Sequence, residues 1–215
     1  MTITWHGLSC VSIRTKSGVS EEVTVVIDPY QNETGLRFPR TLTAEMVAIS
    51  EDHSHANNRA AVGGNPLVIT TPGEFEVKGV FVYGISAPRS GPKGSENRLL
   101  FSVVSEGISL AHVGALDRPL TDSELAHFEQ VDILFLPVGG GEVLDTKRAG
   151  ELISQIEPSI VVPFFYALPN LKMKLDPVEK FLRHMGAGKT ETMPRLKVSR
   201  KDLPEEVEIK VLARD

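Results

Sequence analysis

Residues 49–58 read ISEDHSHANN and begin at the end of an apolar run, MVAI at 46–49. A short apolar run of this kind predicts a buried strand, so the histidines and acids that follow stand where the strand ends. Residues two apart on an extended segment point the same way, so we expect Glu51, His53 and His55 to face one point. Three such side chains are the minimum protein ligand set of a catalytic zinc site.

The same segment also fits the start of a helix, with Ser54 or Asp52 as the capping residue. Two more candidate ligands stand at predicted strand ends, His112 in AHVGALDR and Asp28 in VIDPY. Both have structural alternatives. An Asp before Pro commonly accepts hydrogen bonds from turn amides, and a lone His at a strand end is more often hydrogen-bonded than metal-bound.

The composition is that of an ordinary globular chain of 215 residues, which predicts a single domain over residues 1–215. The one cysteine, Cys10, excludes an internal disulfide and a multi-cysteine zinc cluster, so a metal site must use His, Asp and Glu. A net charge of −5 argues against nucleic acid as a partner, and we interpret the basic segment 171–201 as a solvated face. The sequence has neither a membrane-length apolar run nor a signal pattern, which predicts a cytoplasmic protein without a membrane partner.

Alternating and β-branched residues predict strands in the first half of the chain, and buried apolar runs predict more strands between helices in the second half. The predicted strands lie at 2–5, 9–14, 23–28, 46–50, 67–70, 75–85 with a bend at Lys78-Gly79, 99–104, 108–113, 131–137, 160–163, 196–198 and 207–212.

Three helices are predicted. A capping box at 121–124 opens the first, and an apolar stripe at positions i, i+3, i+4 and i+7 places the second at 145–157. The third has Asp176 as its cap and Pro177 at its first helical position, and it stops at Gly186. The order of elements, antiparallel strands followed by alternating helices and strands, predicts a mixed α/β (α+β) fold.

Nine fragments, in order along the chain, carry a resemblance to a known family. They are ITWHGLSC (3–10), VTVVIDPY (23–30), MVAISEDHSHANN (46–58), PGEFEVKGVFVYGI (72–85), LAHVGALDRPLTDSELA (110–126), VDILFLPVGGG (131–141), ISQIEPSIVVPFFY (153–166), LDPVEKFLRHMG (175–186) and KDLPEEVEIKVL (201–212). Together they resemble the metallo-β-lactamase fold, and in particular its short bacterial and archaeal metal-dependent hydrolase-like branch. The resemblance implies a four-layer αββα sandwich with the site at one edge between the sheets.

The family's metal-binding hallmark, T/S-H-x-H-x-D-H, falls on residues 50–56, where only His53 matches a ligand. Its first His falls on Glu51, its Asp on His55 and its last His on Ala56. Four further positions of the family's pattern are also changed. The Gly-His near the N-terminus meets Gly7-Leu8, and the His expected after GVFVYGI is absent from the shortened segment 86–90. The family's HLGD reads His112-Val113-Gly114-Ala115 without its carboxylate, and its P-x-H-Y segment carries Phe165 in place of His.

These departures predict a catalytically degenerate protein of the metallo-β-lactamase fold, a pseudoenzyme, that uses a vestigial cleft for binding or structure. Ala56, Ala115 and Phe165 have no lone pair to offer a metal, so we expect no metal and no other cofactor. The vestigial cleft comprises Asp28, Glu51, Asp52, His53, His55, His112, Ala115, Phe165 and Tyr166.

The alternative is a metal-dependent hydrolase of phosphoesters or other esters with a rebuilt mononuclear site. Glu51, His53 and His55 would then hold zinc or manganese. The sequence does not define a partner. A possible partner is a second copy of the chain, or a homologous chain that completes a site, since this chain has lost most of the family's ligands.

Overall fold

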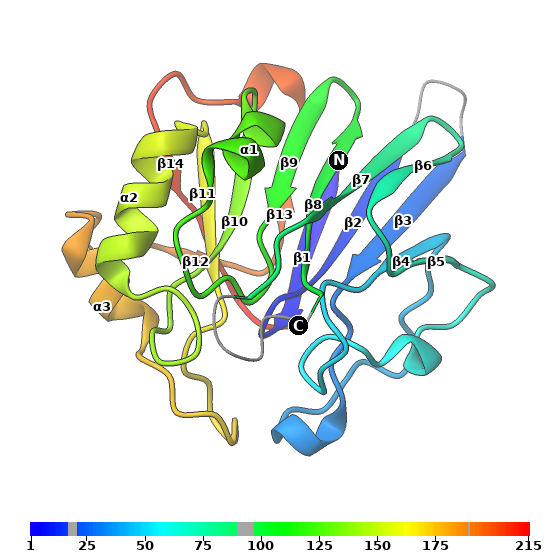
Figure 1. Ribbon diagram of the computed structural model, residues 1–215, viewed down its shortest axis with the longest axis horizontal. Coiled ribbons are helices and arrows are strands. Elements are labelled where there is room, and N and C mark those ends of the chain that lie inside the picture. The colour runs from blue at the N-terminus through cyan, green and yellow to red at the C-terminus, as the bar shows by residue number, and fades with distance from the viewer. Residues whose placement is uncertain (17–20, 90–96, 189) are drawn as a thin grey trace.

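The computed structural model describes residues 1–16, 21–89, 97–188 and 190–215. Two large sheets form the molecule (Figure 1). The six-stranded sheet has the order β13-β1-β2-β3-β4-β5, and the seven-stranded sheet has the order β14-β11-β10-β9-β8-β7-β6. A small third sheet pairs β12 with β15. This confirms the prediction of a mixed α/β fold in which two sheets form a sandwich.

The strands of the six-stranded sheet are β1 (Thr2–Gly7), β2 (Cys10–Lys16), β3 (Glu22–Ile27), β4 (Met46–Ala48), β5 (Leu67–Ile69) and β13 (Leu196–Lys197). Those of the seven-stranded sheet are β6 (Gly73–Val77), β7 (Val80–Ser86), β8 (Leu99–Ser105), β9 (Ile108–His112), β10 (Ile133–Pro137), β11 (Ile160–Phe164) and β14 (Glu208–Ile209). The small sheet has β12 (Thr192–Met193) and β15 (Val211–Leu212).

Both large sheets change from antiparallel to parallel pairing, and this change positions the site. In the six-stranded sheet β3 runs parallel to β4, so the carboxyl ends of these strands lie side by side. In the seven-stranded sheet β9, β10 and β11 run parallel, so their carboxyl ends share one edge. The chain segments that follow β3, β4, β9 and β11 are those that carry the predicted cleft residues.

The strand–helix–strand unit of the second half forms as the sequence predicts. Helix α2 (Thr146–Ile156) begins after Asp145, whose side chain accepts a hydrogen bond from the Arg148 amide at 2.9 Å. It ends at Glu157, which has a left-handed conformation. The apolar stripe of α2 is buried and consists of Ala149, Leu152, Ile153 and Ile156.

The remaining helices are short. They are α1 (Asp122–Leu125), which opens with the predicted capping box, α3 (Val178–His184), and the single-turn 3₁₀ helices η1 (Asn32–Thr34), η2 (Arg59–Ala61), η3 (Ala126–Phe128) and η4 (Arg200–Asp202).

Two element boundaries were predicted wrongly. Pro177, not Asp176, occupies the cap position of α3, and the Asp176 carboxylate forms an ion pair with Lys180 Nζ at 2.7 Å instead of capping the helix. The single strand predicted at 207–212 is two strands, since β14 pairs with β11 while β15 pairs with β12 in the small sheet.

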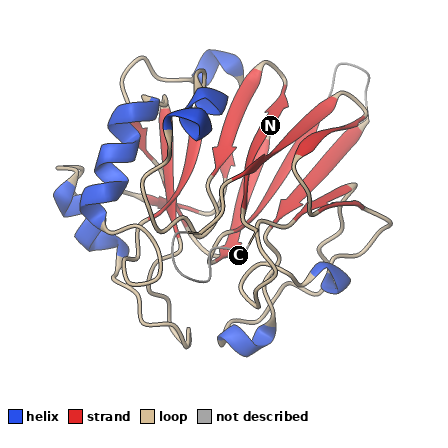
Figure 2. Ribbon diagram, viewed as in Figure 1, coloured by secondary structure: helices blue, strands red, loops and turns tan. Residues whose placement is uncertain are grey.

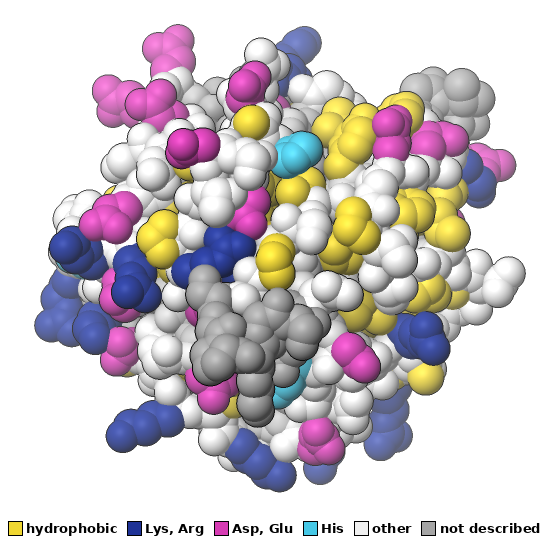
Figure 3. Space-filling model, viewed as in Figure 1, with side chains coloured by type: hydrophobic (Ala, Val, Ile, Leu, Met, Phe, Trp, Pro, Cys, Tyr) yellow, Lys and Arg dark blue, Asp and Glu magenta, His cyan; other side chains and the backbone are white. Residues whose placement is uncertain are grey.

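Helices α1, α2 and α3 gather on one side of the molecule, beside β10, β11 and β14 (Figure 2). No described helix lies over the outer face of β6, β7 and β8 in this view. Hydrophobic side chains appear on the surface above these three strands (Figure 3). Within the described ranges, no helix is long and apolar enough to cross a membrane.

Substitution of Gly139 tests how closely the segment after β10 packs against the segment after β11. A Cβ atom at this position would lie 2.3 Å from the backbone oxygen of Phe165, so Gly139→Ala forces one of the two segments to move. We expect a loss of about 1–3 kcal/mol in the free energy of unfolding, measured by urea denaturation.

Gly150 is the matched control, because it lies inside α2 and its added Cβ would make an ordinary contact of 3.4 Å with Met185 Sδ. Gly150→Ala should stabilise the protein by about 0.5–1 kcal/mol, since Ala restricts the unfolded chain more than Gly does. Equal effects of the two substitutions would contradict the packing described here.

Candidate functional site

Asp28 lies directly after β3, and its side chain is fully buried. Its backbone adopts a left-handed conformation with φ 52°. The carboxylate accepts hydrogen bonds from the Ser50 amide at 2.7 Å and from Ser50 Oγ at 2.8 Å. Burial raises the pKa of Asp28, while the nearby His112 and the Ser50 donors lower it, and burial dominates. Asp28 therefore accepts hydrogen bonds, but from Ser50 after β4 and not from the amides of its own Asp-Pro turn, and it ties β3 to that segment.

His112 ends β9 and is also buried. Its Nε2 lies 2.8 Å from the Ser9 carbonyl oxygen, and its Nδ1 lies 3.3 Å from the Gly114 amide. A carbonyl oxygen only accepts hydrogen bonds, so we assign the proton to Nε2 and the lone pair on Nδ1 to the Gly114 N–H. Burial lowers the pKa of His112 more than the neighbouring Asp28 raises it. Both ring nitrogens are therefore occupied within the protein.

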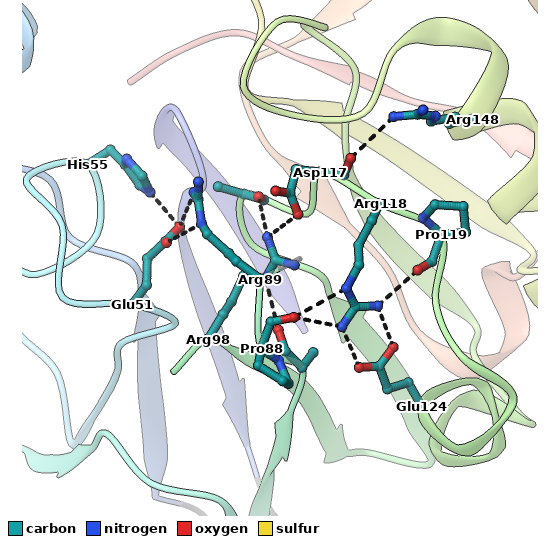
Figure 4. Close-up of polar contacts among 12 residues, drawn as sticks. Glu51, His55, Pro88, Arg89, Arg98, Asp117, Arg118, Pro119, Glu124 and Arg148 are labelled. Carbon is teal, nitrogen blue, oxygen red and sulfur yellow. Dashed lines mark hydrogen bonds and ion pairs between the residues drawn. The ribbon is translucent and has the colours of Figure 1, made fainter. Parts of the chain in front are cut away.

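Glu51 is the centre of a buried ion-pair cluster (Figure 4). His55 Nε2 lies 2.8 Å from Glu51 Oε1. Arg89 approaches both carboxylate oxygens, with Nε 3.0 Å from Oε2 and Nη2 3.2 Å from Oε1. Burial alone would raise the pKa of Glu51, but the hydrogen bonds and positive charges of His55 and Arg89 bring it down to about 2. The carboxylate is therefore ionised at neutral pH and paired with a guanidinium.

The expected extended geometry of Glu51, His53 and His55 is wrong, because the segment folds into turns. The His53 amide donates to the Glu51 carbonyl at 2.9 Å, and the Ala56 amide donates to the His53 carbonyl at 2.8 Å. Neither predicted helix start, Ser54 or Asp52, begins a helix.

The turns bring Glu51 and His55 together and leave His53 exposed on the outer side, with its ring centroid 4.2 Å from that of His55. Although His53 is exposed, partial desolvation of its ring, followed by the positive charge of His55, lowers its pKa. Asp52 points to the surface, where its carboxylate accepts a hydrogen bond from Asn57 at 2.7 Å. Glu51 and His55 are therefore joined by a side-chain hydrogen bond, whereas His53 contacts His55 by ring packing and by accepting a hydrogen bond from the His55 amide at 3.4 Å.

Phe165 lies beside the Glu51 cluster, since its ring meets that of His55 edge-on with the centroids 5.2 Å apart. Its backbone has a left-handed conformation with φ 53°, and its amide donates to the Leu8 carbonyl at 3.1 Å. Leu8 has φ 51°. Left-handed conformations are strained for bulky residues, and such strain concentrates at functional sites. The backbone of the cleft thus keeps an unusual shape at Leu8, Asp28 and Phe165.

The last two cleft residues serve packing and backbone contacts. The ring of Tyr166 packs on that of Trp5 with the centroids 4.9 Å apart, and its hydroxyl donates to the Leu212 carbonyl at 3.5 Å. Burial raises the pKa of Tyr166 above that of a free tyrosine. Ala115 is buried, and its carbonyl oxygen accepts a hydrogen bond from Arg98 at 2.9 Å.

Three arginines that the sequence analysis did not single out hold the cleft together (Figure 4). Arg98 is fully buried and donates to the Ala87 carbonyl at 3.2 Å and to Asp117 Oδ1 at 2.8 Å. Arg118 donates to the Pro88 carbonyl at 2.9 Å, and Arg89 itself pairs with Glu51. The one available signal was that the segment 86–90, where the family has a longer insertion, contains an arginine.

The main candidate ligand side chains of the cleft are engaged within the protein. Asp28 accepts hydrogen bonds from Ser50, and His112 contacts Ser9 and Gly114. The Glu51 carboxylate is paired with Arg89 and His55. Across the described residues, no three His, Cys, Asp or Glu side chains are grouped so that they could hold a metal ion.

A hollow of about 450 Å³ opens beside Glu51. Its lining is mostly polar and carries both signs of charge; it consists of Ile49, Ser50, Glu51, Asp52, Asn57, Arg59, Thr70, Asn97 and Leu99. The volume lies within the range of small-molecule sites.

The two-sheet sandwich, with this cleft at the carboxyl ends of its strands, is that of the metallo-β-lactamase superfamily. Residues 2–164 match the model of the Beta-lactamase superfamily domain, and the chain belongs to this family. The crystal structure of a Thermotoga maritima protein assigned to the Zn-dependent hydrolases of the metallo-β-lactamase superfamily is similar along 98% of this chain and 97% of that chain. Its TM-score is 0.79 and its sequence identity is 28%.

Two archaeal relatives are similar in sequence. A protein of Thermoplasma acidophilum named UPF0173 metal-dependent hydrolase is 24% identical over 208 residues, covering 84% of this chain and 89% of the relative. A UPF0173 protein of Pyrococcus abyssi is 24% identical over 186 residues, covering 77% of this chain and 83% of the relative.

The ion pair of Glu51 predicts an acid-dependent stability. The pKa of Glu51 is about 2 in the folded protein, and that of an unpaired Glu in an unfolded chain is about 4.3. Its contribution to folding is complete above the unfolded value and is lost as the pH falls toward the folded value. The wild type should lose stability between neutral pH and about pH 2. In Glu51→Gln this loss of unfolding free energy should be smaller by on the order of 2–3 kcal/mol.

The measurement is urea denaturation at a series of pH values for the wild type, for Glu51→Gln and for Glu33→Gln. Glu33 is exposed and serves as the control carboxylate. A wild type and a Glu51→Gln variant with parallel pH curves would contradict the assigned pairing.

Proposed function

We propose that this chain is a metal-free member of its family whose former active-site cleft serves binding or structure instead of hydrolysis. The observation that carries the proposal is the pairing of the Glu51 carboxylate with Arg89 through both of its oxygens. Glu51 occupies the first ligand position of the family's hallmark, and a guanidinium next to it repels a divalent cation.

The chemistry of the other ligand positions supports the same proposal. Ala56, Ala115 and Phe165 supply no donor atom, and each of them is buried. A catalytic zinc needs three protein ligands with an open fourth position, and a two-metal centre needs more ligands than that. We derive no hydrolytic step through a metal from this set of side chains.

The binding role is assigned to the hollow beside Glu51. Its walls carry carboxylates, the Arg59 guanidinium and the amides of Asn57 and Asn97. These walls offer both hydrogen-bond donors and acceptors, so they suit a small polar molecule better than an apolar molecule. The hollow could equally be filled by a polar side chain of a partner protein. The net charge of −5 speaks against nucleic acid.

The competing function is a hydrolase with a mononuclear zinc or manganese site at Glu51, His53 and His55. It is favoured by the 2.8 Å contact between Glu51 and His55 and by the neighbouring ring of His53. It also agrees with the names of the Thermoplasma acidophilum and Thermotoga maritima proteins. A metal at this place would have to displace Arg89 from the carboxylate, at the cost of the ion pair.

Metal content separates the two functions. The protein is incubated with excess zinc and manganese, freed of unbound metal, and analysed by mass spectrometry. We expect well below one metal ion per chain and an unchanged melting temperature with either metal, because a ligand that binds the folded state raises its stability. Arg89→Ala tests the reason for this result: removal of the guanidinium should increase the affinity of the cleft for zinc.

Two variants make the result specific. Glu51→Ala/His53→Ala/His55→Ala removes the candidate site, and His127→Ala/His184→Ala removes two exposed histidines elsewhere on the surface. One bound metal ion in the wild type that the triple variant loses and the double variant keeps would refute the proposal and support the hydrolase.

A further inference from the structure

The hollow beside Glu51 lies where three segments of the chain meet. The segment after β4 is joined to β5 by a hydrogen bond of 2.9 Å from the Ile49 amide to the Ile69 carbonyl. It is joined to the start of β8 by a hydrogen bond of 2.7 Å from the Leu99 amide to the Ser50 carbonyl. Ile49 and Leu99 are buried and form the apolar part of the lining. Backbone contacts therefore hold the walls of the hollow in place.

The carboxylate of Glu51 lines the hollow but is already compensated. His55 Nε2 lies 2.8 Å from Oε1, and Arg89 reaches both oxygens, at 3.0 and 3.2 Å (Figure 4). Both oxygens of this carboxylate are thus engaged inside the protein. A positively charged group of a ligand therefore has to find its partner elsewhere on the walls.

Asp52 provides that negative charge. Its Oδ1 accepts a hydrogen bond from Asn57 Nδ2 at 2.7 Å, and Asn57 Oδ1 in turn accepts one from Gln31 Nε2 at 2.8 Å. This chain of two hydrogen bonds orients the Asp52 carboxylate. Within the described part of the chain, no cationic side chain forms an ion pair with Asp52, so its Oδ2 is left as an acceptor.

Arg59 provides the opposite charge on the same walls. Its side chain is exposed, and its guanidinium makes no hydrogen bond or ion pair with the residues that the structure describes. Arg59 and Asp52 thus line one hollow without pairing with each other. The uncharged polar side chains of Thr70 and Asn97 complete this wall. The hollow therefore presents one uncompensated charge of each sign.

From this separation of charge we propose that the hollow binds a small zwitterion, an α-amino acid, with its carboxylate on Arg59 and its ammonium group on Asp52. The inference rests on the proposed function, in which the cleft binds a ligand and holds no metal. A guanidinium binds a carboxylate through two parallel hydrogen bonds, and the second ion pair uses the free Oδ2 of Asp52. The apolar part of the lining, Ile49 and Leu99, suits a short aliphatic side chain.

A zwitterion fits these walls better than a ligand with a single charge. A bound ligand displaces water from both charged side chains, and a displaced charge without a partner is costly. L-alanine pairs with Arg59 and Asp52 at once. Propionate lacks its ammonium group and ethylammonium lacks its carboxylate, so each of them leaves one of the two side chains without a partner.

The test is isothermal titration calorimetry of the full chain after dialysis against EDTA, with L-alanine, L-valine, propionate and ethylammonium as separate ligands. We expect one amino acid to bind per chain, and propionate and ethylammonium to bind at least about tenfold more weakly than L-alanine. Arg59→Gln and Asp52→Asn should each weaken the binding of L-alanine by about tenfold or more, since each removes one charge-assisted pair.

The preference between ligands separates a direct contact from a general effect on the fold. Arg59→Gln should bind L-alanine no better than ethylammonium, and Asp52→Asn should bind L-alanine no better than propionate. Arg183→Gln and Glu205→Gln are the matched controls, because both side chains are exposed and neither lines the hollow. Both controls should bind L-alanine as the wild type does, and unchanged melting temperatures will establish that all four variants fold.

The failure of this inference is distinguishable from the failure of the proposed function. A protein that takes up no zinc and binds neither L-alanine nor L-valine would overturn the inference alone. Propionate that binds as tightly as L-alanine would also overturn it, since the hollow would then be a site for simple anions. Stoichiometric zinc that is lost from the Glu51→Ala/His53→Ala/His55→Ala variant would instead overturn the proposed function.

Discussion

The cleft of this protein depends on one buried carboxylate that needs a cation. Glu51 is removed from water just after the carboxyl end of β4, where an unpaired charge would be costly. Arg89 and His55 supply the compensation at distances between 2.8 and 3.2 Å. Because Arg89 reaches Glu51 across 38 positions of sequence, the pairing also fixes the segment after β7 against the segment after β4.

The arginines of the cleft act as cross-links between loops. Arg98 connects the Ala87 carbonyl with the Ala115 carbonyl and Asp117, and Arg118 connects the Pro88 carbonyl with Glu124. A guanidinium is suited to this because it presents five donors in a rigid plane and stays charged when buried. In a metal centre, the loops are instead held together by their shared coordination of one ion.

Much of the fold could be predicted from the sequence, because strand alternation and helix caps are local signals. The stripe of α2 and the capping box of α1 lie where their spacing places them. The boundary at Pro177 differs from the prediction by one residue, within the range by which helix ends are uncertain from sequence. The arrangement of the site residues was harder to predict. Asp28 and His112 were placed correctly at strand ends, whereas the meeting of Glu51 with His55 depends on turns that an extended reading of the segment excludes.

The arginines could not have been assigned from sequence, since a guanidinium has no local pattern and its partner is chosen by the tertiary fold. Arg98 makes the point most clearly. It is a fully buried charged residue, and its Nη2 has no hydrogen-bond partner among the described residues. The residues next to Arg98 in the sequence do not distinguish it from a surface arginine. Its buried role follows only from its contacts with Asp117 and with two carbonyl groups.

The left-handed backbone at Phe165 has an evolutionary consequence. Phenylalanine is a poor residue for this conformation, whereas histidine adopts it more readily. At Phe165 the chain thus combines a side chain without donor atoms with a main-chain path that suits a histidine better. Under the function proposed above, the change from a ligand to Phe165 would concern the side chain alone and leave the path of the main chain in place.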